Sequence, residues 1–145
     1  MPHATYQTHV DAPTETIWGL LLDKIEHPEK YVPGVTGARI LERFDHGVVR
    51  EMASDRGTVR ERITVDAAAR LIRFTLEDHP DFEGTVVNRI VEPPSPAASG
   101  RPILEFTLDW RPRPGIAERP GDEADAARAI ELAVLQTRRL AEAGA

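Results

Sequence analysis

The chain has 145 residues, 41% of them hydrophobic and 29% charged, which is the composition of a soluble globular domain. Its net charge of −6 argues against a surface that follows nucleic-acid phosphates. The absence of cysteine excludes disulfides, thiolate catalysis and cysteine zinc sites. No run approaches the ~18 apolar residues of a membrane helix, and no signal peptide is visible. We therefore expect one cytoplasmic domain over residues 1–145.

The first quarter of the sequence predicts one strand and two helical segments. Residues 3–11 alternate like a strand, and Thr14 suits the N-cap position of a helix that stops near residue 27. Apolar residues recur in this helix at helical spacing: Ile17, Trp18, Leu20, Leu21 and Ile25. A second short helical turn is expected within residues 28–34.

The rest of the sequence predicts six strands followed by one long helix. The alternating segments are 37–44, 48–53, 58–66, 70–78, 84–92 and 102–111. Proline-rich stretches at 93–100 and 112–120 predict loops, the first of them exposed and mobile. Residues 122–143 carry an apolar stripe behind an acidic first turn, which indicates a helix. The order predicts an α+β fold with a seven-stranded antiparallel sheet.

Two charged residues fall on the apolar faces of neighbouring strands. Glu61 alternates in phase with the apolar residues of its strand: Val59, Ile63 and Val65. If Asp55 and Arg56 are the central residues of a two-residue turn, Arg50 lies directly across from Glu61. Charges are rarely placed inside a protein without a use. The pattern predicts either a polar group that lines a pocket or a structural ion pair.

The order of elements resembles the helix-grip (Bet v 1-like) fold of the START, Bet v 1 and polyketide-cyclase (SRPBCC) superfamily. Within it, the chain is most similar to the AtaL-like family, a group largely of unknown function. The segments that carry the resemblance span nearly the whole chain: 18–25, Pro28, 31–34, Arg50, 59–63, Asn88 and 104–110. The resemblance implies a curved sheet around the long C-terminal helix, two short helices after the first strand, and a deep cavity between sheet and helix. It names no reaction, because the superfamily includes cyclases, lyases, lipid carriers and hormone receptors.

Further residues are candidates for contact with a ligand in such a cavity. Asn88 is an amide on an apolar strand face, and it either orients a ligand or makes an internal hydrogen bond. Four large side chains are either cavity wall or ordinary core: Trp18, Met52, Phe74 and Phe106. No pair of the five histidines has metal-ligand spacing, so neither a metal nor another cofactor is expected.

Two hypotheses of different class follow. The first is a protein that binds a hydrophobic aromatic or polyketide-like small molecule, as a monomer or homodimer, without a nucleic-acid or membrane partner. The alternative is a cyclase, dehydratase or isomerase in which Glu61 is the general base and Arg50 stabilises an oxyanion. A regulatory protein–protein module has less support, because the sequence indicates no exposed apolar patch.

Overall fold

The computed structural model describes residues 2–93 and 100–144, which form a seven-stranded antiparallel sheet and two α-helices. The strands lie in the order β1-β7-β6-β5-β4-β3-β2, so each neighbours its sequence successor except at β1, which pairs with β7. The elements in chain order are β1 (His3–His9), α1 (Thr14–Glu26), the 3-10 turn η1 (Pro28–Lys30), β2 (Val35–Phe44), β3 (Gly47–Ser54), β4 (Gly57–Asp66), β5 (Leu71–Asp78), β6 (Phe82–Val91), β7 (Ile103–Pro112) and α2 (Asp122–Glu142).

Most element boundaries lie within one residue of the sequence prediction. The expected second helical turn is present as the 3-10 turn η1, whereas β1 ends two residues earlier than predicted, and β2 and β6 each begin two residues earlier. The N-cap prediction was wrong: Thr14 is the first residue of α1, and Pro13 occupies the cap position without a side-chain hydrogen bond. The loop predicted at 93–100 lies outside the described residues except for its two ends.

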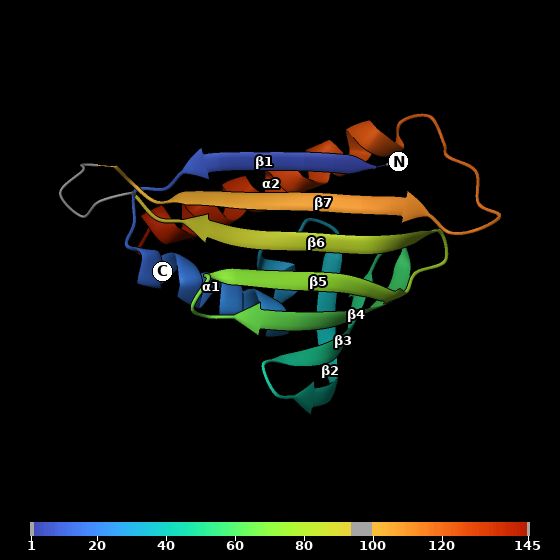
Figure 1. The fold of residues 1–145 in the computed structure, drawn as a ribbon, viewed down its shortest axis with the longest axis horizontal. Coiled ribbons are helices and arrows are strands. Elements are labelled where there is room, and N and C mark those ends of the chain that lie inside the picture. Colours follow the sequence, from blue (N-terminus) through green and yellow to red (C-terminus); the bar gives the residue numbers. More distant parts are fainter. Residues whose placement is uncertain (1, 94–99, 145) are drawn as a thin grey trace.

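Both helices lie on one face of the sheet, which curves around them. Figure 1 shows α2 behind β1 and β7, α1 behind β4 and β5, and the strands β2 and β3 turned away from the direction of β1. Fully buried apolar side chains come from both layers: Ile17, Leu21, Ile63, Ile72, Leu104 and Val134. Burial of this apolar surface between sheet and helices holds the layers together. This is the helix-grip architecture that the resemblance implies.

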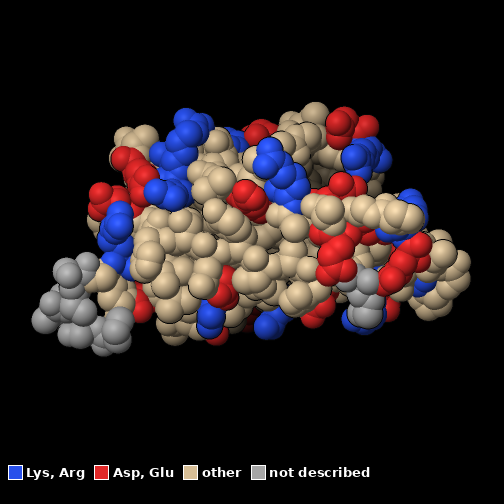
Figure 2. Space-filling view, turned by 90° about the horizontal axis from the view of Figure 1, so that it is seen from above, with Lys and Arg blue, Asp and Glu red and all other residues tan. Residues whose placement is uncertain are grey.

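The surface carries charges of both signs. Seen from above, the face formed around β1 and α2 has blue and red side chains scattered among uncharged surface (Figure 2). Within the described part of the chain, neither α1 nor α2 is long and apolar enough to cross a bilayer.

Candidate ligand-binding site

The predicted pair of opposite charges is present inside the molecule. Ser54 pairs with Gly57 and Arg50 pairs with Glu61 in the β3–β4 hairpin, the register that the sequence predicts. The guanidinium Nη2 of Arg50 lies 2.6 Å from Oε1 of Glu61. Both side chains are less than a tenth exposed, so this ion pair lies on the inner face of the sheet.

Arg50 also holds the C-terminal end of α1. Its Nη1 donates hydrogen bonds to the carbonyl oxygens of Lys24 (3.1 Å) and Ile25 (2.9 Å). A cation is favoured at this end of a helix, where unpaired carbonyls carry partial negative charge. Nη2 of Arg50 donates both to Oε1 of Glu61 and to the sulfur of Met52, which lies 3.5 Å away. The Nε of Arg50 is buried and has no partner among the described residues.

A lysine that the sequence analysis did not single out completes the cluster. Lys24 projects from α1 onto the sheet and is 6% exposed. Its Nζ donates a hydrogen bond to Oδ1 of Asn88 on β6. The same Nζ lies 4.2 Å from the ring centre of Phe106 and 4.9 Å from that of Phe74. The ammonium is therefore held by one amide and two aromatic rings instead of by a carboxylate.

The environment of Lys24 changes its acid–base chemistry. Burial lowers the pKa of Lys24 to about 7, and the positive charge of Arg50 acts in the same direction. The carboxylate of Glu61 opposes this shift. Lys24 thus exchanges a proton near neutral pH, which an ordinary lysine does not.

The sequence does contain a signal for Lys24. Position 24 lies three residues after Leu21 and seven after Ile17, so it falls on the apolar stripe of α1. A lysine in that stripe breaks the pattern as clearly as Glu61 breaks the pattern of β4. Long lysine side chains at stripe margins usually reach solvent, and only the sheet opposite α1 determines that this one stays inside.

The structure brings the predicted residues together to different degrees. Asn88, Phe74 and Phe106 are buried, and Asn88 pairs directly with Phe106 in the β6–β7 ladder. The Nδ2 of Asn88 is buried without a partner among the described residues. Met52 is half-buried against Arg50. Contact of any of them with a ligand stays a prediction.

Trp18 is buried in α1, but it lies away from the charged cluster. The guanidinium carbon of Arg70 sits 5.5 Å from its ring centre, and Arg70 also forms an ion pair with Glu15 in the first turn of α1. The cluster side chain Lys24 lies almost two turns farther along the helix. Trp18 therefore packs where α1 begins, whereas the polar cluster lies where α1 ends.

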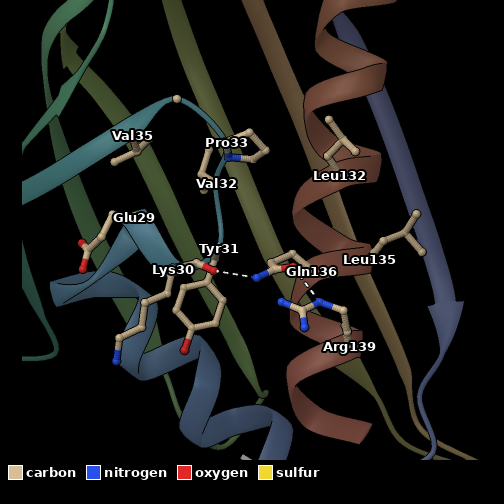
Figure 3. A pocket seen from close by; sticks show the side chains of 11 residues that line it. Glu29, Lys30, Tyr31, Val32, Pro33, Val35, Leu132, Leu135, Gln136 and Arg139 are labelled. Atoms are coloured by element: carbon tan, nitrogen blue, oxygen red, sulfur yellow. Dashed lines mark hydrogen bonds between the residues drawn. The ribbon is translucent and has the colours of Figure 1, made fainter. Parts of the chain in front are cut away.

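An open pocket of about 380 Å³ lies between the segment 29–35 and α2. Figure 3 shows Tyr31, Val32 and Pro33 on one wall and Leu132 and Leu135 on the other. The two walls are joined by a hydrogen bond from Nε2 of Gln136 to the carbonyl oxygen of Lys30 at 3.0 Å. None of the seven predicted site residues lines this pocket.

Tyr31 connects this pocket to α1. Its hydroxyl donates a 2.7 Å hydrogen bond to Oδ2 of Asp23, the residue before Lys24. Burial and this carboxylate raise the pKa of Tyr31 far above its usual value. Burial alone would raise the pKa of Asp23, but hydrogen bonds from Tyr31 and Lys30 hold it below its usual value. Tyr31 thus stays a neutral donor that ties the pocket wall to the helix.

Four buried polar residues lie together on the inner side of the sheet, and we refer to them as the inner polar cluster: Lys24, Arg50, Glu61 and Asn88. It can bind an oxygen-bearing group through nitrogen donors, and it can exchange one proton near neutral pH. Within the described ranges, no three histidine, aspartate or glutamate side chains gather in a way that could hold a metal ion.

Comparison with known proteins agrees with this architecture. The sequence matches the protein family AtaL, described as acetylaranotin biosynthesis cluster protein L, over residues 10–144. The Zhui aromatase/cyclase from Streptomyces sp. R1128 superposes with a TM-score of 0.71 at 19% identity, covering 97% of this chain and 93% of that one. The protein XoxI from Bacillus cereus gives 0.72 at 16% identity, with 97% and 96% covered. An uncharacterised protein from Bacillus thuringiensis gives 0.69 at 18% identity, with 97% and 98% covered. No curated protein matches the sequence.

Proposed function

Since the chain belongs to the AtaL family, we propose that it binds a hydrophobic small molecule, aromatic or polyketide-like, between the sheet and α2. Arg50, Glu61 and Asn88 supply the polar contacts, and Phe74 and Phe106 supply the apolar ones. The likeness in fold to an aromatase/cyclase supports this class of ligand.

The observation that carries the proposal is the inner polar cluster. Its four members are each at most 6% exposed, although burying charged groups is costly unless they are fully paired. Two of its nitrogen donors, on Arg50 and Asn88, lack a partner among the described residues. Buried polar atoms are nearly always satisfied, so unpaired donors beside aromatic rings favour a ligand that supplies the missing acceptor.

The pocket between segment 29–35 and α2 supports a route for the ligand. Its volume falls in the range of small-molecule sites. Only one hydrogen bond, from Gln136 to Lys30, joins its two walls among the described residues. Tyr31 then separates it from α1, on which Lys24 lies. Movement of segment 29–35 away from α2 would widen this pocket toward α1.

Native mass spectrometry of freshly purified protein, compared with the denatured mass, tests occupancy directly. We expect a non-covalent adduct whose mass identifies the ligand. In parallel, a ¹⁵N NMR titration with 2-naphthamide as a neutral aromatic probe should shift the side-chain amide of Asn88 and the backbone amide of Phe106. For a probe of this size we expect a dissociation constant of about 1 mM or lower.

The absence of both an adduct and interior shifts would overturn the proposal. Shifts confined to the surface of β2 and the outer sheet face would do the same.

An enzyme is the alternative function, and the pKa of Lys24 near 7 is the observation that favours it, because proton transfer is most efficient near the working pH. Glu61 would act as base, Arg50 would stabilise an oxyanion, and Lys24 would exchange a further proton beside them. The geometry gives this alternative less support, because Glu61 is engaged by Arg50 at 2.6 Å.

The variant Glu61→Gln separates the two functions. Glu51→Gln is its matched control, since Glu51 is a neighbouring carboxylate on the outer face that pairs with Arg39. A cognate substrate that Glu61→Gln still binds but no longer converts, while Glu51→Gln converts it normally, would establish the enzyme. Unchanged conversion in Glu61→Gln would exclude Glu61 as the base.

A further inference from the structure

The charges of the inner polar cluster do not balance. Arg50 and Lys24 are cationic when protonated, and Glu61 is the one carboxylate of the cluster. Glu61 is taken by Arg50 at 2.6 Å. Among the described residues no carboxylate forms an ion pair with Lys24, whose polar partner is the neutral oxygen of Asn88. One positive charge is therefore left without a counter-charge inside the protein.

The hydrogen-bond inventory is unbalanced in the same direction. The buried atoms without a partner in this cluster are the Nε of Arg50 and the Nδ2 of Asn88. Both are N–H donors, and neither can accept a hydrogen bond. A site with unpaired donors and surplus positive charge is suited to bind an anionic oxygen. Such an oxygen accepts stronger hydrogen bonds than a neutral one.

The rings around Lys24 define the rest of the ligand. Nζ of Lys24 lies over both Phe106 and Phe74, and the guanidinium carbon of Arg50 is 5.5 Å from the ring centre of Phe74. A flat aromatic body packs well against such faces. Because both rings are buried beside the unpaired donors, a ligand that reaches those donors also contacts aromatic side chains, which favours an aromatic body over an aliphatic one.

We infer that the inner polar cluster selects aromatic ligands that carry an anionic oxygen, a carboxylate or phenolate. Lys24, when protonated, carries the positive charge that balances the negative charge of this oxygen. This inference rests on the proposed function, because it names the ligand class of the same site.

The charged groups that act on Lys24 explain why binding and protonation are coupled. Arg50 on β3 favours the neutral amine and Glu61 on β4 favours the ammonium, whereas the side chains facing Lys24 from β5, β6 and β7 (Phe74, Asn88 and Phe106) are uncharged. An arriving anion adds a second negative charge. At pH 8, where the free protein holds Lys24 mostly neutral, binding of the anion should therefore take up close to one proton.

Two probes of the same shape test the inference: 2-naphthoate, which is anionic, and 2-naphthamide, which is neutral. Isothermal titration calorimetry at pH 8, in phosphate and in Tris, measures affinity and proton uptake together. We expect wild type to bind 2-naphthoate roughly tenfold more tightly than 2-naphthamide, with uptake of nearly one proton per naphthoate.

Two variants and a matched control assign the effect to Lys24. Lys24→Met should bring the two affinities within about twofold, and Lys24→Arg should keep the preference but abolish proton uptake, because arginine stays charged. Arg89→Met removes an exposed cation next to Asn88 on β6, where Arg89 pairs with Glu105 away from the cluster, and it should behave like wild type. If Lys24→Met does not fold, wild type and Lys24→Arg still decide the question.

The outcomes separate the two proposals. Equal binding of both probes by wild type would overturn the anionic ligand class and leave the proposed function standing. Failure of both probes to bind would overturn the anionic aromatic ligand class, and the proposed function would fall with it if native mass spectrometry also found no adduct. A naphthoate preference without proton uptake in wild type, or one that survives in Lys24→Met, would overturn the role of Lys24.

Discussion

Lys24 should impose its own pH dependence on stability. Its pKa is lowered from 10.5 to about 7 by burial. Below pH 7 both the folded and unfolded chains hold the proton, so the cost of burying the ammonium is fully present. Between pH 7 and 10.5 the unfolded chain binds more protons than the folded one, and the free energy of unfolding therefore rises with pH.

Urea unfolding of wild type and Lys24→Met across pH 6–10 measures this effect. The stability of wild type relative to the variant should rise by up to about 1.4 kcal/mol per pH unit between pH 7.5 and 10. Parallel stability curves for wild type and Lys24→Met would show that the amine is not buried in solution.

Removing one partner of the Arg50–Glu61 pair should lower the free energy of unfolding much more than replacing both partners by apolar residues. Arg50→Met strands a buried carboxylate and should destabilise the protein by about 3–5 kcal/mol. Adding Glu61→Leu should recover at least half of that loss, because no unpaired charge remains. Denaturant melts of the two single variants and the double variant give the coupling energy; additive losses would mean that the pair is solvated.

At the level of residues, the sequence revealed one half of the site. Alternation in two strands and a two-residue turn fix the register, so the pairing of Arg50 with Glu61 follows from local rules. The position of Lys24 does not, because a stripe on a helix defines a face but not the surface against which it packs. Local pattern predicts a pair within one hairpin better than a contact between α1 and β6.

Gly84 permits the close approach of β6 to β7. Its φ is +133°, and a Cβ there would overlap the carbonyl oxygen of Asp109 and lie 2.9 Å from the Cα of Trp110. Gly115 also has a positive φ, +86°, but a Cβ there meets nothing within 4 Å. Gly84→Ala should therefore destabilise the protein by at least about 2 kcal/mol more than Gly115→Ala. Equal melting temperatures for the two variants would contradict this.

At the level of elements, hydrophobic periodicity and the turn-forming residues were sufficient to predict the order and type of every helix and strand. Boundaries were less certain where a glycine lies within a strand: Gly84 and Gly37 contributed to the late predicted starts of β6 and β2. The N-cap at Thr14 was wrong because proline at 13 can also precede a first helical turn without a side-chain bond. Capping patterns locate a helix start only to within a residue or two.

The two edges of the sheet are protected differently. α2 packs against β1, whereas β2 has no fully buried residue and pairs with β3 through two register shifts. Backbone amides exchange most readily where few apolar contacts cover them. Hydrogen exchange followed by mass spectrometry should therefore find β1 more protected than β2. Equal protection of both edges would indicate that α2 is not docked in solution.

The fold of the whole molecule could be predicted, but the side chains that fill its interior could be predicted only in part. Strand count, helix positions and the resemblance together imply a sheet that grips a helix. Which interior space is filled depends on side-chain packing across elements distant in sequence, as in the contact of Lys24 with Asn88 or of Gln136 with Lys30. Sequence periodicity does not encode those distances.

The contacts of Arg50 limit which positions of the inner polar cluster can be substituted during evolution. The same guanidinium binds the carbonyls at the end of α1 and the carboxylate of Glu61, so it joins helix and sheet as well as polarising the interior. Replacing Lys24 or Asn88 alters the chemistry offered to a ligand and leaves that joint intact. Among descendants that acquire new ligands, we therefore expect positions 24 and 88 to diverge first and the arginine at position 50 to be inherited unchanged.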